Sequence, residues 1–441
     1  MTATPVTMLA AYSRYNSRHD TNREASMAKR HMHEIFTRDF VMLSTINLAV
    51  FFGFQMINVG LPIYVAQLGA DAFTVGVIAS IFTVTATIVR VFAGAILDRF
   101  GRIGTMVSGI AIMACMVVSY AVFPIIGVII GLRVVHGLGW GLGSTATSTI
   151  AADIIPKKRF AEGMGYFALT NAVSGAIAPA LSIFLVQGPG AVYMLGVSAG
   201  FTILALALSI ADAKHLGKRT APAIAHPESL AEPPKSRPSQ PQASAGALDA
   251  FFERQALLPA MAMLLVNVGF ASITTFVALH AAAQGVPEIA GCFIAYAITT
   301  VISRPFIGRT IDRKGYRGPS IFATLCAAAS LLVIAVSTSL PMFCAGGALG
   351  GLGIGSAMGT FQAMAVATVP PQRRGVATST FFVFFDLGIA IGSFVAGIIA
   401  NAVGYAAMYQ IIAIFPILAC VFFLVAGKER LAATRPNAEN E

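Results

Sequence analysis

The stretch RVFAGAILDRFGR at residues 90–102 occurs a second time in the chain, as RPFIGRTIDRKGYR at residues 304–317. Five positions are shared at one offset of 214 residues (304 minus 90): Arg90, Gly94, Asp98, Arg99 and Gly101 recur as Arg304, Gly308, Asp312, Arg313 and Gly315. Each copy lies where a long apolar segment gives way to a short charged turn and a second apolar segment begins. This repeat predicts a duplicated unit of membrane-length helices.

The composition is that of an integral membrane protein. Of 441 residues, 56% are hydrophobic and only 11% are charged, whereas soluble domains carry about a quarter charged residues. The first 38 residues are polar and basic, and they lack the apolar core and cleavage site of a signal peptide. The five cysteines, all in apolar segments, are Cys115, Cys292, Cys326, Cys344 and Cys420. Their odd number and their placement argue against a disulfide framework and against a metal site.

The net charge of +10 reports membrane topology rather than nucleic-acid binding. Lysine and arginine are concentrated in both termini and in every alternate loop, and the intervening loops contain neither residue. By the positive-inside rule we expect the basic loops and both termini in the cytoplasm, beside anionic lipid head groups. The expected partner is therefore the lipid bilayer, with no nucleic acid.

Twelve segments approach the roughly 20 apolar residues that a transmembrane helix needs. They cover residues 41–65, 73–97, 103–123, 125–152, 161–186, 190–211, 256–283, 289–311, 319–339, 342–369, 375–400 and 405–427. The connections on one side, such as 67–72, 187–190 and 401–404, are short, so neighbouring helices must run antiparallel. The expected fold is all-α, with twelve transmembrane helices in two pseudo-symmetric six-helix bundles.

Residues 212–254 differ from both flanks because they combine six prolines with scattered charges and small residues. Such a composition cannot bury a core, and it predicts a disordered cytoplasmic linker. The chain then divides into an N-terminal tail (1–38), a first bundle (39–211), the linker (212–254), a second bundle (255–427) and a C-terminal tail (428–441).

Further correspondences relate the two halves. Gly137-Leu-Gly-x-Gly recurs as Gly351-Leu-Gly-x-Gly at the offset of 214, and one residue later in register Asn171 falls opposite Asp386. Repeats of this kind place a substrate site near the bilayer midplane between the halves. Rocking of one half against the other then gives alternating access to that site.

The doubled Asp-Arg-x-Gly turn resembles the signature loop of the major facilitator superfamily, and the resemblance covers nearly all of residues 40–427. In that superfamily the loop is a cytoplasmic latch that holds the outward-facing state. The resemblance implies this role for Arg90, Gly94, Asp98, Arg99, Gly101, Arg102, Arg304, Gly308, Asp312, Arg313 and Gly315, and for Asp153, which resembles an acid that joins the network through Arg102. Asp98 and Asp312 can face the positive N-termini of helices that begin near Gly375 and Gly163. The alternative is that these charges only anchor loops and set topology.

An arginine lies deep in the span 125–152. Arg133 is nine residues in from Pro124, a depth of about 14 Å at about 1.5 Å per residue, where a guanidinium is expensive and usually functional. The sequence Arg133-Val-Val-His136-Gly137 resembles the family pattern Arg-x-x-Gln-Gly, with histidine where glutamine is usual. We expect Arg133 and His136 to contact substrate or to influence a proton site. The alternative is a structural hydrogen-bond network.

Asp386 is the only carboxylate deep within a span. Because an apolar environment lets an acid exchange its proton near neutral pH, Asp386 is the candidate for the coupling proton, and Arg133 is its expected charged partner. The alternative is an interface acid that is hydrogen-bonded between the spans 73–97 and 375–400.

Polar and aromatic side chains recur at helical spacing in four spans, which line the cavity in the superfamily. The candidate cavity residues are Asn47, Phe51, Phe54, Gln55, Asn58, Gly137, Trp140, Ser144, Asn267, Phe270, Thr274, Met358 and Gln362. Aromatic, thioether and amide groups suit a medium-sized, partly apolar molecule. Each of these residues can equally serve to pack helices together.

The span 161–186 contains Gly165, Gly175 and Pro179 and resembles, incompletely, the Gly/Pro stretch of antiporters in this superfamily, because the final paired glycines are absent. Other stretches of the sequence, such as Ala-Ala-Asp-Ile-Ile-Pro, resemble those of bacterial twelve-helix drug:proton antiporters and of relatives that export metallophores. We therefore expect a secondary transporter rather than an enzyme. It exports a small, partly apolar, drug-like molecule and uses a proton gradient in place of any cofactor.

Three alternatives to drug export stay open. They are export of a metallophore (an opine-type chelator), uptake of a sugar, organic acid or osmolyte by proton symport, and a sensor or scaffold that transports nothing. In each case we expect a monomer in the bacterial cytoplasmic (inner) membrane.

Overall fold

The computed structural model describes residues 35–156, 159–220, 253–286, 288–367, 369–370 and 373–426, apart from a few side chains within these ranges. All regular secondary structure in the described residues is helical. The predicted linker and the two predicted tails lie largely outside this part of the chain, and so do the side chains of Asp98 and Asp312.

Six long helices make up the first half. They are α2 (Arg38–Gln67), α3 (Ala72–Phe100), α4 (Arg102–Val122), α5 (Ile126–Ile154), α6 (Phe160–Gln187) and α7 (Ala191–Thr220). α7 continues past residue 211, where the sixth span was predicted to end. The buried carboxylate of Asp212 accepts a hydrogen bond there from Arg38 Nη2 at the start of α2 (3.3 Å), so this turn is fixed to the first bundle.

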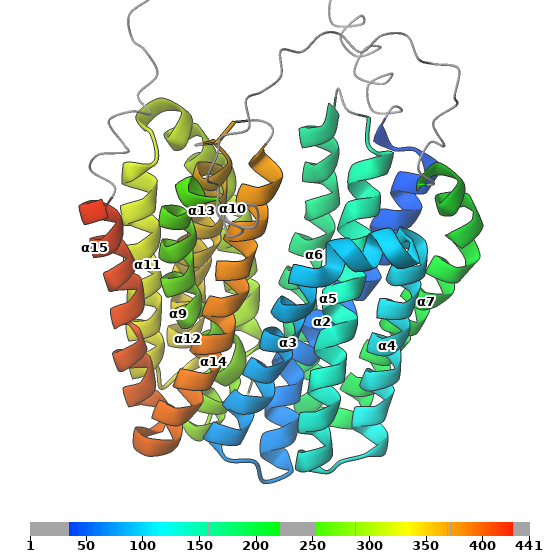
Figure 1. The fold of residues 1–441 in the computed structure, drawn as a ribbon. Helices are drawn as coiled ribbons and strands as arrows, with labels where there is room; N and C mark the ends of the chain where they lie inside the picture. The colour runs from blue at the N-terminus through cyan, green and yellow to red at the C-terminus, as the bar shows by residue number, and fades with distance from the viewer. Residues whose placement is uncertain are drawn as a thin grey trace, which may run out of the picture.

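The second half repeats this plan, except that a π-helical segment interrupts one helix and the last span is divided between two helices. It contains the 3-10 turn η2 (Arg254–Ala256), α9 (Leu257–Ala283), α10 (Ala290–Lys314), α11 (Arg317–Val336), α12 (Leu340–Gly350), the π-helical η3 (Gly351–Gly355), α13 (Ser356–Ala367), α14 (Arg374–Ile412) and α15 (Ile414–Ala426). Among the described residues, eleven segments are long and apolar enough to span a membrane, and the last covers 50 residues. This segment reverses at Gly404 (φ 82°, ψ 168°), so its two arms make two passes and the predicted twelve are reached (Figure 1).

Glycines with positive φ mark the reversals of the chain. Those at the turns on one side, which we call the short-loop end, are Gly69, Gly190, Gly285 and Gly404. Gly101 and Gly315 lie in the two Asp-Arg turns on the other side, the charged end, with φ of 78° and 75°. Because a side chain strains this backbone conformation, both copies of the motif require glycine at this position.

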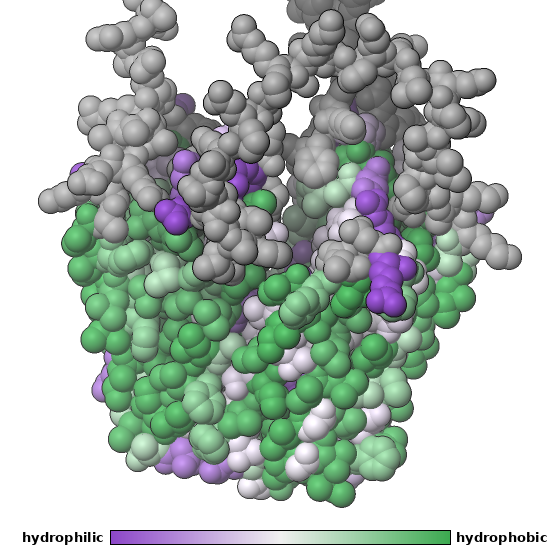
Figure 2. Space-filling view, in the orientation of Figure 1, coloured by the Kyte–Doolittle hydropathy of each residue, from purple (hydrophilic) through white to green (hydrophobic). Residues whose placement is uncertain are grey.

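The two bundles meet at the short-loop end and part toward the charged end (Figure 1). Their flanks are apolar, and polar residues gather at the two ends (Figure 2). Large side chains in the middle of α7, such as Ile203 and Leu204, are about half exposed (49% and 48%). An apolar surface of this extent requires a bilayer around it.

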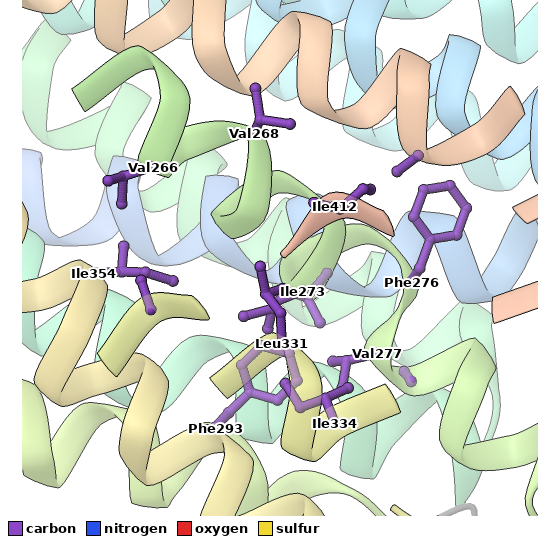
Figure 3. Packing of buried hydrophobic residues seen from close by; sticks show 14 of the residues in the cluster. Val266, Val268, Ile273, Phe276, Val277, Phe293, Leu331, Ile334, Ile354 and Ile412 are labelled. Atoms are coloured by element: carbon purple, nitrogen blue, oxygen red, sulfur yellow. The ribbon is translucent and has the colours of Figure 1, made fainter. Parts of the chain in front are cut away.

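Each bundle is packed internally by apolar side chains and close helix contacts. In the second bundle, Val277 of α9, Phe293 of α10 and Ile334 of α11 lie together (Figure 3). η3 approaches α11 so closely that a Cβ on Gly353 would lie 2.3 Å from the backbone nitrogen of Ala327. Each half is therefore a tightly packed unit, which suits rigid-body motion.

Candidate functional site

An ion pair joins the two bundles within the membrane region. Arg90 of α3 pairs with Asp386 of α14, and Arg90 Nη2 also lies 3.4 Å from Ser144 Oγ of α5. Both charged side chains are mostly buried, with exposures of 24% for Arg90 and 12% for Asp386. The bridge therefore links α3 and α5 of the first half to α14 of the second.

The predicted pairing of Asp386 with Arg133 is wrong. Arg133 points into the first bundle, where its Nε donates to the carbonyl oxygen of Ile78 (3.1 Å) and its guanidinium lies 4.3 Å from the centre of the Phe82 ring. Counting residues along the helices placed both charges deep within their spans, but it did not give the direction in which each side chain faces. The alternative, an interface acid between the spans 73–97 and 375–400, describes the observed geometry.

A seam of small residues closes the short-loop side of this ion pair. A Cβ on Gly76 of α3 would lie 2.6 Å from the carbonyl oxygen of Ser393 and 2.9 Å from Cα of Gly397, both in α14. Beside the seam, the rings of Phe73 and Phe394 lie 6.0 Å apart. Backbone contact this close leaves no passage between α3 and α14 at the short-loop end.

The corresponding contacts at the charged end are open. A Cβ on Gly308 of α10, or on Gly165 of α6, would have no heavy atom within 4 Å. Phe92 and Phe306, near the ends of α3 and α10, are about 60% exposed (59% and 62%). No other helix approaches closely at these two glycines in this conformation, which is open toward the charged end.

Four aromatic rings of the first half form a cluster between α2, α3 and α5. Trp140 stacks on Phe54 with ring centres 3.8 Å apart, Phe51 lies 4.8 Å from Trp140, and Phe82 lies 5.5 Å from Phe54. Phe51 and Phe54 are half-buried. The structure thus brings together three of the predicted cavity residues and adds Phe82, which sequence reasoning missed because it lies in a span that was not assigned to the cavity.

Behind this cluster lies a buried polar group. Tyr120 Oη of α4 and His136 Nδ1 of α5 are 3.0 Å apart, and Arg133 is only 1% exposed. Arg133 Nη1 and His136 Nε2 have no hydrogen-bond partner among the described residues. Gly137, predicted to line the cavity, instead packs on α3, where a Cβ would lie 2.5 Å from the carbonyl oxygen of Phe82.

The predicted amide residues of α2 and α9 are used mainly within their own bundles. Asn47 is buried, and its Nδ2 donates to Thr170 Oγ1 and Asn171 Oδ1 of α6 (2.6 Å each). Asn267 is buried, and its Nδ2 donates to the carbonyl oxygen of Phe385 (3.0 Å), directly before Asp386. Buried amides that find partners in the bilayer stabilise helix packing, so neither side chain is part of an open wall.

The other candidate wall residues are half-buried. These are Gln55 and Asn58 of α2, Phe270 and Thr274 of α9, and Met358 and Gln362 of α13. Phe270 stacks on Tyr296 of α10, with ring centres 6.1 Å apart. Gln55 lies beside Gly175 of α6, where a Cβ would be 3.4 Å from Gln55 Nε2. Pro179 lies one turn further along the same helix.

At the charged end the predicted ion pair between Arg102 and Asp153 is formed. Arg99 lies with its guanidinium 5.6 Å from the ring centre of Phe100. The side chains of Asp98 and Asp312 lie outside the described residues, so the predicted contacts of these two acids with helix N-termini stay predictions. Arg304 and Arg313 are exposed.

A further pair at this end was missed by sequence reasoning. Glu253 pairs with Arg373, and the backbone N–H of Glu253 donates to Thr380 Oγ1 (3.0 Å), which ties the start of α9 to α14. The offset of 214 relates these residues to Asp39 and Arg159 of the first half, and this correspondence was the available signal. Among the described residues, no group of three His, Cys, Asp or Glu could hold a metal ion.

The sequence and the fold of this chain are similar to those of known proteins. The model of the Major Facilitator Superfamily matches residues 43–317 and 285–441. A staphylopine export protein of Staphylococcus aureus is 25% identical over 384 residues, which cover 84% of this chain and 92% of that protein. An uncharacterised MFS-type transporter of Burkholderia mallei is 32% identical over 145 residues, 33% of this chain and 36% of that protein.

Solved structures share the fold at low sequence identity. A POT family transporter in complex with 5-aminolevulinic acid has a TM-score of 0.71 at 13% identity, over 89% of this chain and 96% of that one. A bacterial homolog of the human lysosomal transporter Spinster, inward-facing and unoccupied, has a TM-score of 0.70 at 14% identity, over 90% of this chain and 98% of that one.

Proposed function

Because the chain belongs to the Major Facilitator Superfamily of membrane transporters, we propose that it exports a small molecule in exchange for protons, with Asp386 as the proton-carrying residue. The observation that carries this proposal is the Arg90–Asp386 bridge between the bundles. Export rather than uptake is supported by the staphylopine export protein, which is similar along nearly its whole length.

The proposed coupling uses the charge on Asp386 as the link between the halves. In the conformation open to the charged end, Asp386 is paired with Arg90, as expected after its proton has left. In the state that is open at the short-loop end, the seam at Gly76 and Gly397 has parted, and Asp386, separated from Arg90, binds a proton from that side. Return to the present conformation brings the Arg90 guanidinium back to Asp386 and favours the charged carboxylate, so the proton leaves toward the charged end. Proton uptake on one side and release on the other are thereby tied to the change of access.

The orientation follows from the distribution of basic residues. The positive-inside rule puts the charged end in the cytoplasm, so the present conformation is inward-open. We assign the protein to the bacterial cytoplasmic membrane, with both termini inside and the two Asp-Arg turns acting as the latch of the outward-facing state. One chain contains both bundles and the whole bridge, so a monomer suffices, and the proton gradient supplies the energy.

Two substrate classes have a specific observation in their favour. A metallophore is favoured by the staphylopine export protein, whose similarity covers 92% of that protein. A partly apolar, drug-like molecule is favoured by the half-buried rings of Phe51 and Phe54, which pack on the buried Trp140, because aromatic walls suit such ligands. We place the metallophore first, since the similarity extends over both halves of the transporter.

The test is transport by purified protein in proteoliposomes with an imposed pH gradient. An opine-type chelator and a lipophilic cation serve as the two labelled substrates. We expect the gradient to accelerate transport of one of them, and Asp386→Asn to abolish this acceleration while exchange of substrate at equal pH continues. Arg317→Met, which removes an exposed charge at the start of α11, is the matched control. Gradient-driven transport that survives in Asp386→Asn would refute the coupling role.

The same assay separates the remaining alternatives. Gradient-driven movement of a sugar or organic acid in the direction of the protons would identify a symporter. Absence of transport for every compound, in protein that is folded and correctly inserted, would identify a sensor or scaffold.

A further inference from the structure

Cationic side chains outnumber acids in the middle of the spans. Arg90, Arg133 and Arg304 lie deep in apolar segments, whereas Asp386 is the only carboxylate at comparable depth. Arg304 is 14 residues from the start of α10 at Ala290, or about 21 Å along the helix at about 1.5 Å per residue. A charged side chain at such a depth is costly and marks a functional site by default. Arg90 has Asp386 as its counter-charge, whereas no acid pairs with Arg304 in the part of the chain that the structure describes.

Arg304 is the counterpart of Arg90 in the second half, but its surroundings differ at both partner positions. Arg90 contacts Ser144, and the equivalent of Ser144 at the offset of 214 is Met358. Arg90 pairs with Asp386, and the residue opposite Asp386 in the repeat is Asn171. In this sequence correspondence the chain keeps the guanidinium in the second half and replaces the carboxylate by an amide, whose Oδ1 accepts from Asn47 Nδ2 of α2.

The structure leaves the Arg304 side chain accessible. Arg304 is exposed, and no hydrogen bond or ion pair of its side chain occurs among the described residues. Two turns before Arg304 on α10, Tyr296 stacks on Phe270 of α9. On the charged side of Arg304, one turn further along α10, the space beside Gly308 is open. A molecule that enters from the charged end can thus reach the guanidinium.

We propose that Arg304 binds a carboxylate group of the transported molecule, and that this carboxylate takes the place that Asp386 occupies beside Arg90. A guanidinium and a carboxylate match as a bidentate pair. The substrate class is accordingly a carboxylic acid that also carries an apolar or amide portion for the neighbouring Phe270 and Tyr296. The identification of the bound molecule as cargo rests on the proposed transport function, and the binding itself does not.

This arrangement also makes the reorientation of the carrier depend on its cargo. For α6 and α10 to close at the charged end, Arg304 must leave water. Without a counter-ion this desolvation is unfavourable, so the empty carrier is held open on that side. A bound carboxylate supplies the missing charge, just as Asp386 does between α3 and α14. The loaded carrier can then close.

Binding can be measured without transport because the chain contains a single tryptophan, Trp140. Trp140 of α5 lies in the aromatic cluster of the first half, and α10 belongs to the second half. The probes are hippurate and hippuramide, which differ only in carboxylate versus amide. We expect the titrated Trp140 fluorescence of the purified protein in nanodiscs to give a dissociation constant for hippurate about tenfold lower than for hippuramide, the difference that one charge-assisted bond provides.

Three variants test the assignment. Arg304→Met should abolish the preference for hippurate, whereas Arg309→Met, which removes an exposed arginine five residues further along the same helix, should retain it. Asn171→Asp introduces the acid that the repeat lacks into α6, the helix of the first half that packs against α10, and keeps an oxygen acceptor for Asn47 Nδ2. It should abolish the preference with the arginine still present. This variant keeps the test decisive if Arg304→Met fails to fold.

The outcomes are distinct. Equal binding or no binding of the two probes by the parent protein, or a preference that survives in Arg304→Met, overturns the proposal. A response to chloride alone that hippurate cannot compete with assigns the site to an inorganic anion and also overturns it. If hippurate binds more tightly than hippuramide and the variants change this preference as expected, but no compound is transported under a pH gradient, the carboxylate site is supported and the exporter function is refuted. If uncharged compounds are transported and no carboxylate preference is found, the exporter function stands and the carboxylate site falls.

Discussion

Replacing Gly76 by alanine should drive the protein out of the conformation that is closed at the short-loop end. The added Cβ would lie 2.6 Å from the carbonyl oxygen of Ser393 and 2.9 Å from Cα of Gly397. Both neighbouring atoms belong to the backbone of α14, so no side-chain rotation relieves the contact, and α3 and α14 must move apart by several tenths of an ångström. Overpacking of this kind costs about 1–3 kcal/mol.

The contact exists only while the seam is closed, so its cost acts on the conformational equilibrium. A change of about 1–3 kcal/mol corresponds to a shift of roughly 5- to 150-fold in the ratio of the two conformations. In the proposed orientation, Gly76→Ala therefore favours the outward-open state by that factor.

Pulsed electron paramagnetic resonance can measure this shift. In a background without the five native cysteines, spin labels at Gln67 and Asn401 report the distance between the two bundles at the short-loop end, since both residues are exposed there. We expect Gly76→Ala to move the distance distribution toward longer values. Gly196→Ala is the matched control, because a Cβ at Gly196 meets nothing within 4 Å, while both variants gain the same helix propensity of about 1 kcal/mol. An unchanged distribution in Gly76→Ala, or an equal shift in Gly196→Ala, would refute the reasoning.

Three further predictions concern stability. Tyr120→Phe leaves the buried His136 Nδ1 without its partner at 3.0 Å and should lower the free energy of unfolding by about 1–3 kcal/mol, measured by thermal unfolding of the purified protein. Gly353→Ala would put a Cβ 2.3 Å from the α11 backbone and should cost about 1–3 kcal/mol or more, seen as a loss of monodisperse protein. Asp71 caps α3 by accepting from the Thr74 N–H (2.9 Å), and hydrogen bonding to the Thr74 side chain and to this N–H lowers the pKa of Asp71, so Asp71→Ala should cost about 1 kcal/mol at neutral pH. That stabilisation is present above the unfolded-state pKa of about 3.9 and is lost as the pH falls through the lower folded-state value, so Asp71→Ala and the parent protein should converge in strong acid.

Each of these predictions has a control. Tyr193→Phe removes the hydroxyl of a tyrosine that is 62% exposed and should leave the melting temperature unchanged. Gly359→Ala lies on the helix after η3 with open space around its Cβ position, so it should not reduce the yield. Asp71→Asn keeps an oxygen acceptor without the carboxyl titration, and its difference from the parent protein should be small at neutral pH. A variant and control that behave alike would contradict the contact in question.

The sequence predicted elements whose signal is local. α9 (257–283) and α4 (102–122) lie within one residue of their predicted spans, because apolar length and flanking charge define such segments. The duplicated turn was readable because Gly101 and Gly315 meet the same backbone requirement in both halves. The one boundary that moved clearly, the end of α7, depends on a contact between Asp212 and Arg38, which are 174 residues apart.

The candidate site was less predictable because it depends on the direction in which side chains face. Arg90 was assigned to the latch by its place in the motif, although it lies eight residues, or about two helical turns, before Asp98 and hence nearer the membrane centre. Gly137 follows the cavity pattern of its helix but packs on the α3 backbone. Asn47 satisfies its amide within its own bundle. The depth of a residue can be counted along its helix. The direction in which its side chain points depends on how the six helices of a bundle pack, and the residue pattern of one helix does not give this packing.

The position of these features along α3 explains how distant parts of the transporter can act together. Gly76 at the seam, Phe82 under the Arg133 guanidinium, Arg90 in the bridge and Asp98 at the charged turn all lie on one helix, Ala72–Phe100. Gly76 and Arg90 are 14 residues apart, or about 21 Å at about 1.5 Å per residue. α3 contains no proline and no internal break, so it can move as a single rigid body. A change of charge at Asp386, which pairs with Arg90, therefore acts through α3 on the seam toward one end and on the turn toward the other. No further connection between the seam and the Asp-Arg turn is needed to explain how the two ends of the transporter respond together.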